Sequence, residues 1–430
     1  MPTSDGPTAE PQADASGRVG SGLGAITIST VVAGAIGYLI LALVAKFVTD
    51  PARYLEFTSF WSGMYLLVGA LGGLQQEIAR ASTPAPPNQP GGTAGGLGRL
   101  ALASGLGVAA LVGLSSPLWA RSVFAERPAP LVAALIVALV GYVGIAVLAG
   151  VLYGLKLWSV IAVLTITDGV LRLGLVVAAL LIGHDLRMLA WAVALPLPLT
   201  LTMALVWLVF GGRVRGRYRL DVGPAVLASN AAKAVGGAVA LGVLTSGLPL
   251  LLGLAPTSES KAAVGALTFV VILTRAPLVA PLLALQSWLT VSFRDRSQAS
   301  PRSLMFVEVG VLGVSALVAV VAFFVEPWLL QALWGGRYQV DGATCAGVVF
   351  TAGLTAGLCV SGPATLASGR HSAYVFGWAA AAALTVGILF LPLPLPLPLP
   401  LVARALLALA VGPLVGIAVH VVAMTRGAKS

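Results

Sequence analysis

The stretch Pro130–Val151 reads PLVAALIVALVGYVGIAVLAGV and contains no charged residue. A helix of about 20 apolar residues crosses the hydrocarbon core of a bilayer, which is about 30 Å thick. Eleven more apolar stretches lie between residues 23 and 424. The chain is 58% hydrophobic and 9% charged, whereas a soluble domain carries about 25% charged residues. The sequence therefore predicts an all-α polytopic membrane protein with about 12 transmembrane helices.

Short polar connections separate the predicted spans. The spans are 23–47, 57–76, 98–119, 130–151, 159–182, 187–210, 225–252, 262–290, 304–325, 341–366, 372–392 and 401–424. Residues 1–22 are rich in Pro, Ala, Ser and acids and predict a disordered tail, and residues 425–430 form a second tail. Proline at alternate positions predicts a break in the helix at 195–198 and an extended connector at 391–400.

The second half of the chain repeats features of the first in the same order and at nearly constant spacing. The matched pairs are Gln75 with Gln286, Pro117 with Pro327, and Gly154 with Gly369. This pattern predicts two homologous six-helix lobes, 23–210 and 225–424, joined by the basic linker 211–224 and related by an axis along the membrane normal. Chance similarity among helices rich in Leu and Gly is the alternative.

The distribution of the 25 Lys and Arg residues predicts the orientation. The larger share falls on the side of the membrane that holds both termini, so both termini are predicted to be cytoplasmic. The linker contributes most through Arg213, Arg215, Arg217 and Arg219, which alternate and would face anionic headgroups. The net charge of +10 thus points to the lipid bilayer as the partner and not to nucleic acid. We expect a multi-pass protein of the bacterial plasma (inner) membrane.

Charged residues inside the spans are the candidate functional residues, because a charge at mid-span costs at least about 2.5–3.5 kcal/mol. Arg275 lies near the middle of its span, and this position predicts that it lines a water-filled cavity. Lys233 is a second candidate, although its long side chain can also reach the membrane surface. Asp168 and Arg172, four residues apart, share one helix face and can form either a structural pair or an ion-coupling site.

Polar residues also gather at the cytoplasmic end of the second span. Gln76, Glu77 and Arg80 follow a long apolar run and can bind substrate or cap the membrane interface. Glu308 lies near the start of its span and is either a residue of the membrane interface or a functional residue. The glycine pairs Gly69/Gly73 and Gly353/Gly357 have the spacing typical of close helix contacts.

Motifs for catalysis, metal binding and cofactor binding are absent from the sequence. Cys345 and Cys359 are about 21 Å apart along one predicted helix and cannot form a disulfide with each other. The three histidines form no metal-ligand spacing, and neither a phosphate-binding loop nor a nucleophile elbow is present. We therefore expect no catalytic residue, no metal, no cofactor and no enzyme activity.

The order of these features resembles the polysaccharide or lipid-linked oligosaccharide flippases of the multidrug/oligosaccharidyl-lipid/polysaccharide (MOP) exporter superfamily. The resemblance covers all twelve spans. It rests on Phe60-Trp61, on 73–80 (GLQQEIAR), on 168–172 (DGVLR), on 273–277 (LTRAP), on 334–338 (WGGRY) and on 366–371 (LASGRH).

This resemblance implies a MATE/MOP-like body of two lobes that alternates between inward and outward openings. It also implies a cationic cavity lined by spans 23–47, 57–76, 225–252 and 262–290. Arg275, Lys233, Arg80, Gln76 and Glu77 become candidates for binding a lipid-linked glycan. Polysaccharide assembly enzymes are then the expected partners. A multidrug or small-molecule exporter of the same superfamily, with Asp168 for cation coupling, is the first alternative. A membrane glycan polymerase or ligase is disfavoured, because the predicted external loops are short.

Overall fold

The computed structural model describes residues 12–85, 94–124, 128–183, 185–210, 218–295, 301–391 and 399–426. The first lobe contains α1 (Gln12–Phe47), α2 (Pro51–Ala81), α3 (Ala94–Phe124), α4 (Pro128–Gly154), α5 (Trp158–Ile182), α6 (Leu186–Ala194), α7 (Pro196–Leu205) and the π-helix η1 (Val206–Phe210). The second lobe contains α8 (Pro224–Thr245), α9 (Leu248–Leu254), α10 (Lys261–Asp295), α11 (Pro301–Trp334), α12 (Gly342–Ala367), α13 (His371–Phe390) and α14 (Leu401–Arg426).

The chain is a multi-pass membrane protein. In the described part of the chain, 11 helices are long and apolar enough to cross a membrane. α10 occupies the place of the predicted span 262–290. Large apolar side chains such as Leu118 and Phe306 are more than four-fifths exposed, as expected for helices that have lipid as their solvent. The prediction of an all-α membrane protein built from two helical lobes is confirmed.

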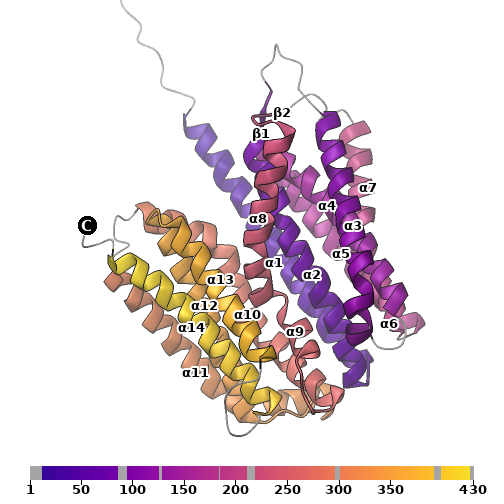
Figure 1. Cartoon of the computed structure of the whole chain (residues 1–430), viewed down its shortest axis with the longest axis vertical. Coiled ribbons are helices and arrows are strands. Elements are labelled where there is room, and N and C mark those ends of the chain that lie inside the picture. Colours follow the sequence, from indigo (N-terminus) through magenta and orange to yellow (C-terminus); the bar gives the residue numbers. More distant parts are fainter. Residues whose placement is uncertain are drawn as a thin grey trace, which may run out of the picture.

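The two lobes lie side by side, with α8 running between them along α2 (Figure 1). α12 forms the centre of the second lobe, where most of its residues are buried. α11 lies at the periphery of the same lobe, and most of its side chains are exposed. The largest buried apolar cluster spans both lobes and includes Ile40, Tyr54, Phe269 and Tyr338.

Several helices extend beyond the predicted bounds, and three places are informative. α1 begins at Gln12, inside the predicted tail, because extending a formed helix into an Ala-containing segment costs less than nucleating one. The predicted break at Leu195 is confirmed, since it separates α6 from α7. The predicted single span 225–252 is wrong: it divides at Ser246 and Gly247 into α8 and α9.

Ser62 of α2 bridges this unpredicted division. Its hydroxyl donates to the carbonyl of Ser246 and accepts the amide proton of Leu250 at 3.1 Å. Proline at position 249 lacks an amide hydrogen, so an unbroken helix would lose a hydrogen bond there. A side chain from another helix therefore satisfies backbone groups that the division leaves without helical partners.

A small antiparallel sheet also escaped the sequence analysis. β1 (Ser82–Pro84) follows α2, and β2 (Tyr218–Leu220) precedes α8, with Ser82 opposite Leu220. β2 occupies part of the basic linker, whereas Arg213, Arg215 and Arg217 lie outside the described residues. Residues 392–398 of the Leu-Pro repeat also lie outside them. We call the end of the molecule that carries β1 and β2 the strand end (Figure 1). α2 runs from the opposite end to β1, and we call this opposite end, where α1 ends at Phe47 and α2 begins at Pro51, the far end. The segment between α11 and α12 lies at the far end too, since Arg337 contacts Lys46 there.

At the far end, Asp341 caps α12. Its carboxylate accepts hydrogen bonds from the backbone amide and the hydroxyl of Thr344, both at 2.8 Å. These hydrogen bonds hold the pKa of Asp341 below its usual range. The cap therefore stabilises the fold above the unfolded-state pKa, and its contribution is lost as the pH falls through the folded-state pKa.

The Asp341→Ala variant is expected to lose about 1 kcal/mol of stability at pH 7, because the first turn of α12 loses its acceptor. Asp341→Asn, which keeps a capping oxygen, serves as the control and should remain close to the parent. Thermal unfolding of the purified proteins in one detergent measures the difference. Equal melting temperatures for the parent and Asp341→Ala would contradict this role of the cap.

Candidate functional site: a central cavity

A cavity of about 590 Å³ lies between the lobes and extends into the first one. Residues of α1, α2, α8, α9 and α10 line it, close to the arrangement that the resemblance implied, but α4, α5 and α7 also contribute. Most of the lining is apolar, with five aromatic side chains: Tyr38, Trp61, Tyr65, Tyr142 and Tyr153. A mostly apolar cavity with a few polar groups is typical of ligand-binding sites.

Arg275 on α10 lines this cavity and is 7% exposed. Its Nη2 donates to the hydroxyl of Thr355 at 3.0 Å and to the carbonyl of Leu244 at 3.3 Å. Among the described residues, no partner meets its Nη1. α8 and α12 thus hold the guanidinium in place, while donor capacity is left for a ligand. Because an unpaired buried charge is costly, this arrangement suits an anionic group.

Asp168 and Arg172 on α5 line the same cavity and form the predicted pair. Nη2 of Arg172 donates to both carboxylate oxygens of Asp168, at 2.8 and 2.7 Å. The guanidinium carbon of Arg172 also lies 5.3 Å from the centre of the Tyr65 ring, a cation–π distance. The pair neutralises itself, so Arg275 supplies the excess positive charge of the described cavity wall.

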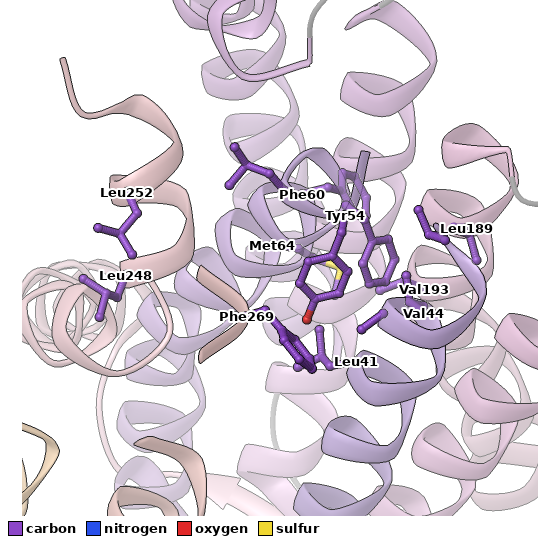
Figure 2. Close-up of a cluster of buried hydrophobic side chains, with 14 of the residues drawn as sticks. Leu41, Val44, Tyr54, Phe60, Met64, Leu189, Val193, Leu248, Leu252 and Phe269 are labelled. Carbon is purple, nitrogen blue, oxygen red and sulfur yellow. The ribbon is translucent and has the colours of Figure 1, made fainter. Parts of the chain in front are cut away.

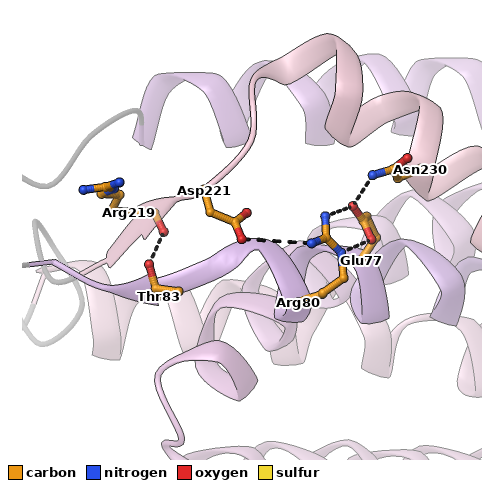
Figure 3. Close-up of polar contacts among 6 residues, drawn as sticks. All are labelled: Glu77, Arg80, Thr83, Arg219, Asp221 and Asn230. Carbon is orange, nitrogen blue, oxygen red and sulfur yellow. Dashed lines mark hydrogen bonds and ion pairs between the residues drawn. The ribbon is translucent and has the colours of Figure 1, made fainter.

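Glu77 and Arg80 lie at the strand end, outside the cavity lining (Figure 3). Nε and Nη2 of Arg80 donate to the two oxygens of Glu77 at 2.8 and 2.6 Å. Asn230 of α8 donates to the same carboxylate at 3.0 Å, and Asp221 lies 4.0 Å from Arg80. These contacts connect α2 with the linker and α8, and together with the β1–β2 pairing we call them the clasp.

Gln76 and Lys233 are exposed and do not line the cavity either. Lys233 lies on α8 three turns before Leu244, the first residue of that helix to reach the cavity wall. The structure therefore brings Arg275, Asp168 and Arg172 to one cavity. It does not bring Lys233, Arg80, Gln76 or Glu77 there, because helix rotation and depth, not only position within a span, decide which side chains line it.

Aromatic side chains join the two lobes at the far end. Tyr54 of α2 meets Phe269 of α10 and Tyr338, with ring centres 5.4 and 5.5 Å apart. Phe269 also contacts Tyr338 at 4.3 Å and Trp334 of α11 at 4.9 Å. Figure 2 shows the Tyr54 ring turned toward Phe269 within the buried cluster. We call these four rings the far-end gate.

Hydrogen bonds add to the aromatic contacts between the lobes at the far end. Arg337 donates to the carbonyl of Lys46 at 2.9 Å, and Tyr338 donates to the carbonyl of Ala45 at 3.3 Å. Gly335 and Gly336 adopt φ of +65° and +73°, which lets the chain turn back toward α1 after α11. From the sequence, residues 334–338 contributed only to the family resemblance. The sequence signal for this turn is the pair Gly335–Gly336, with Trp334 directly before it and Tyr338 two residues after it.

No protein-family model matches the chain. The protein Rv1510 of Mycobacterium tuberculosis is 32% identical over 412 residues, covering 93% of this chain and 90% of the relative. The protein Rv3630 of the same organism is 33% identical over 445 residues, covering 99% of this chain and 97% of the relative. Relatives at this identity, aligned over nearly their full lengths, share one architecture with the chain.

Solved structures extend the comparison to the fold. An inward-facing MATE family multidrug resistance transporter of the MOP superfamily matches 94% of this chain and 97% of its own, with a TM-score of 0.62 and 12% identity. An outward-facing one matches 95% of both chains, with a TM-score of 0.60 and 14% identity. Identity this low supports conclusions about the fold alone. The chain has the MATE-type fold of the MOP superfamily and belongs to one family with the mycobacterial proteins Rv1510 and Rv3630.

Proposed function

We propose that the protein is a membrane transporter that moves a lipid-linked oligosaccharide or polysaccharide precursor across the bilayer by alternating access. The observation that carries the proposal is Arg275, a buried cation with an unpartnered donor in a cavity between two lobes. The gate closes the lobes at the far end, so the cavity would open there only after the lobes move apart.

The chemistry of such a substrate fits the cavity. A polyprenyl diphosphate glycan has a charged, hydroxyl-rich head that hydrocarbon excludes, and a tail that can stay in lipid. Arg275 would donate to a phosphate oxygen, and the faces of Trp61 and Tyr65 would pack on sugar rings. No bond is made or broken in this step. The enzymes that assemble the glycan would be the partners that supply the substrate.

Replacing Arg275 by alanine is expected to lower glycan export at least about tenfold, since a hydrogen bond to a charged group contributes about 1.5–3 kcal/mol. Arg275→Lys keeps the charge and should retain part of the export. The test is complementation of a deletion strain, with lipid-linked glycan measured on each leaflet and with equal amounts of each variant in the membrane.

Lys233→Ala provides the matched control, because Lys233 is an exposed intramembrane cation on the neighbouring helix. Its export should equal that of the parent. Normal export by Arg275→Ala would remove the guanidinium from the mechanism and with it the main support for an anionic substrate.

Export of cationic drugs is the second candidate function, and the presence of Asp168 in the cavity favours it. Neutralising Asp168 in Asp168→Asn should then abolish efflux of an organic cation such as ethidium. Under the glycan proposal, cells that carry the parent protein show no ethidium efflux above the deletion strain.

A further inference from the structure

α11 presents a narrow polar seam to the second lobe and a broad apolar face to its surroundings. Phe306 and Phe324 are 82% and 70% exposed. The buried side chains recur at intervals of four and seven residues, which places them on one helix face. They include Leu304, Glu308, Ser315, Ala319, Glu326 and Leu330. Two carboxyl groups on the inner face of a lipid-exposed helix need a physical explanation.

Glu308 is 6% exposed, and neither of its carboxyl oxygens has a hydrogen-bond partner among the described residues. Its Oε2 lies against Gly357 of α12, where any added side chain would collide with it, and Ile417 of α14 lies at the same place. One turn earlier on α12, Gly353 leaves space for Ser315 of α11 in the same manner. The glycine pair on α12 thus forms a receptacle for two polar side chains of α11.

One turn further along α12, Ser361 meets a buried histidine of α14, His420. Nδ1 of His420 lies 3.0 Å from the hydroxyl of Ser361, and Nε2 lies 3.2 Å from the carbonyl of Tyr374. Because the carbonyl only accepts, Nε2 carries a proton. The Ser361 hydroxyl also lies 3.5 Å from the carbonyl of Leu358, so it can either donate to Nδ1 or accept from it. Both ring nitrogens are thus engaged by Ser361 and Tyr374, and neither forms a hydrogen bond with the carboxyl of Glu308.

The groups facing Glu308 favour the protonated carboxyl. The titratable side chains along α12 and α14 include Cys359, His420 and Arg426, and the second acid on α11 is Glu326; none of them forms an ion pair with the described Glu308 carboxyl. An ionised Glu308 carboxylate would lose its water without gaining a hydrogen bond or an ion pair in return. The protonated, neutral carboxyl is therefore the more stable form at this position. Among the described residues, no cluster of three or more His, Cys, Asp or Glu side chains could hold a metal ion.

We propose that Glu308 is a proton-binding site in the second lobe, separate from the central cavity, and that loss of its proton biases the lobes toward opening of the far-end gate. The link to gating rests on the proposed transport function. Glu308 lies about two turns from the start of α11 at Pro301. Ionisation would draw the carboxylate toward water at that end, which requires α11 to move relative to α12.

Infrared spectroscopy of the protein in lipid nanodiscs tests the proton site directly. The parent should show the C=O stretch of a protonated carboxyl near neutral pH, and it should disappear at high pH. Glu326 is equally buried and can contribute to the same band. Glu308→Gln should therefore remove part of the band in the parent and the remaining band in a Glu326→Gln background, whereas Asp168→Asn should leave it unchanged, because Asp168 is ion-paired. Absence of the band in the parent, or a band that Glu308→Gln leaves unchanged in both backgrounds, would overturn the assignment.

Maleimide labelling of an Ala45→Cys variant, with Cys345 and Cys359 replaced by alanine, tests the link to gating. Ala45 is fully buried at the far end. After normalisation to the denatured protein at each pH, labelling should rise with pH in this variant. It should stay at its low-pH level when Glu308→Gln is added, because glutamine retains the shape of the neutral acid. The same pH response with and without Glu308→Gln would overturn the link.

Neither measurement uses the glycan, so the proton site and the transport function can fail separately. Glycan export that fails in every variant, with both measurements as expected, would refute only the transport proposal. Glycan export by the parent, with no band and no pH-dependent labelling, would refute only the Glu308 proposal. Labelling that follows sodium concentration instead of pH would replace the proton by a metal cation and overturn it.

Discussion

Replacing Gly73 by leucine is expected to remove nearly all folded protein from the membrane, whereas replacing Gly69 by leucine should leave its amount unchanged. A Cβ atom on Gly73 would overlap the backbone of Ala234 and Val235 in α8. Backbone atoms cannot rotate away, so α2 and α8 would have to separate. Overpacking of this kind costs about 1–3 kcal/mol or more, and separation would also strain the neighbouring contact between Glu77 and Asn230.

The two glycines make a matched pair, because they lie one turn apart on the same helix. In the described part of the chain, no atom from another element lies within 4 Å of the position that a Cβ on Gly69 would occupy. Fluorescence-detected size-exclusion chromatography of tagged variants measures the folded fraction. Gly73→Ala, a smaller change, should give an intermediate result. Equal monodisperse peaks for both leucine variants would contradict the close approach of α2 and α8.

The second large effect is expected from Phe269→Ala, which should open the far-end gate. Truncating a buried phenylalanine costs about 3–5 kcal/mol. Phe269 contacts Tyr54 across the lobes, so part of this cost weakens only the closed arrangement. Each 1.4 kcal/mol changes the ratio of closed to open molecules about tenfold. Maleimide labelling of Ala45→Cys should therefore rise at least about tenfold in rate.

Phe60→Ala is the control for this prediction. Phe60 is as fully buried as Phe269, but its aromatic partner is Phe124 of the same lobe, at 6.1 Å. Its loss should lower the melting temperature to a similar extent without changing the labelling rate. Equal labelling in the Phe269→Ala and Phe60→Ala variants would show that the gate does not hold the lobes together.

The residues of the candidate site were predictable to different degrees. The Asp168–Arg172 pair follows from helical spacing alone, since residues four apart lie on one face. Arg275 was identified because a lone charge near mid-span needs a polar environment. Lys233 was chosen as a second charge within a span, and Gln76 as part of the polar cluster at the end of the second span. Both lie on exposed faces, which the sequence cannot distinguish from buried ones without the packing of the helices.

Other features depend on segments that are far apart in the chain. The gate joins Tyr54 to Tyr338, and the clasp joins Glu77 to Asn230. Their sequence signals are local and weak: an aromatic residue near a span end, or an asparagine within a span. The receptacle at Gly353 and Gly357 was predicted as a helix contact, but its occupants, Ser315 and Glu308, were not.

The sequence by itself determined the class of protein, the approximate spans and the short-range pair on α5, because membrane insertion and helical periodicity act on neighbouring residues. Only the tertiary structure decided which charges share the cavity, where α8 separates from α9, and which rings close the far end. Those outcomes depend on the rotation and depth of each helix against its neighbours. Residues distant in the chain set that packing jointly.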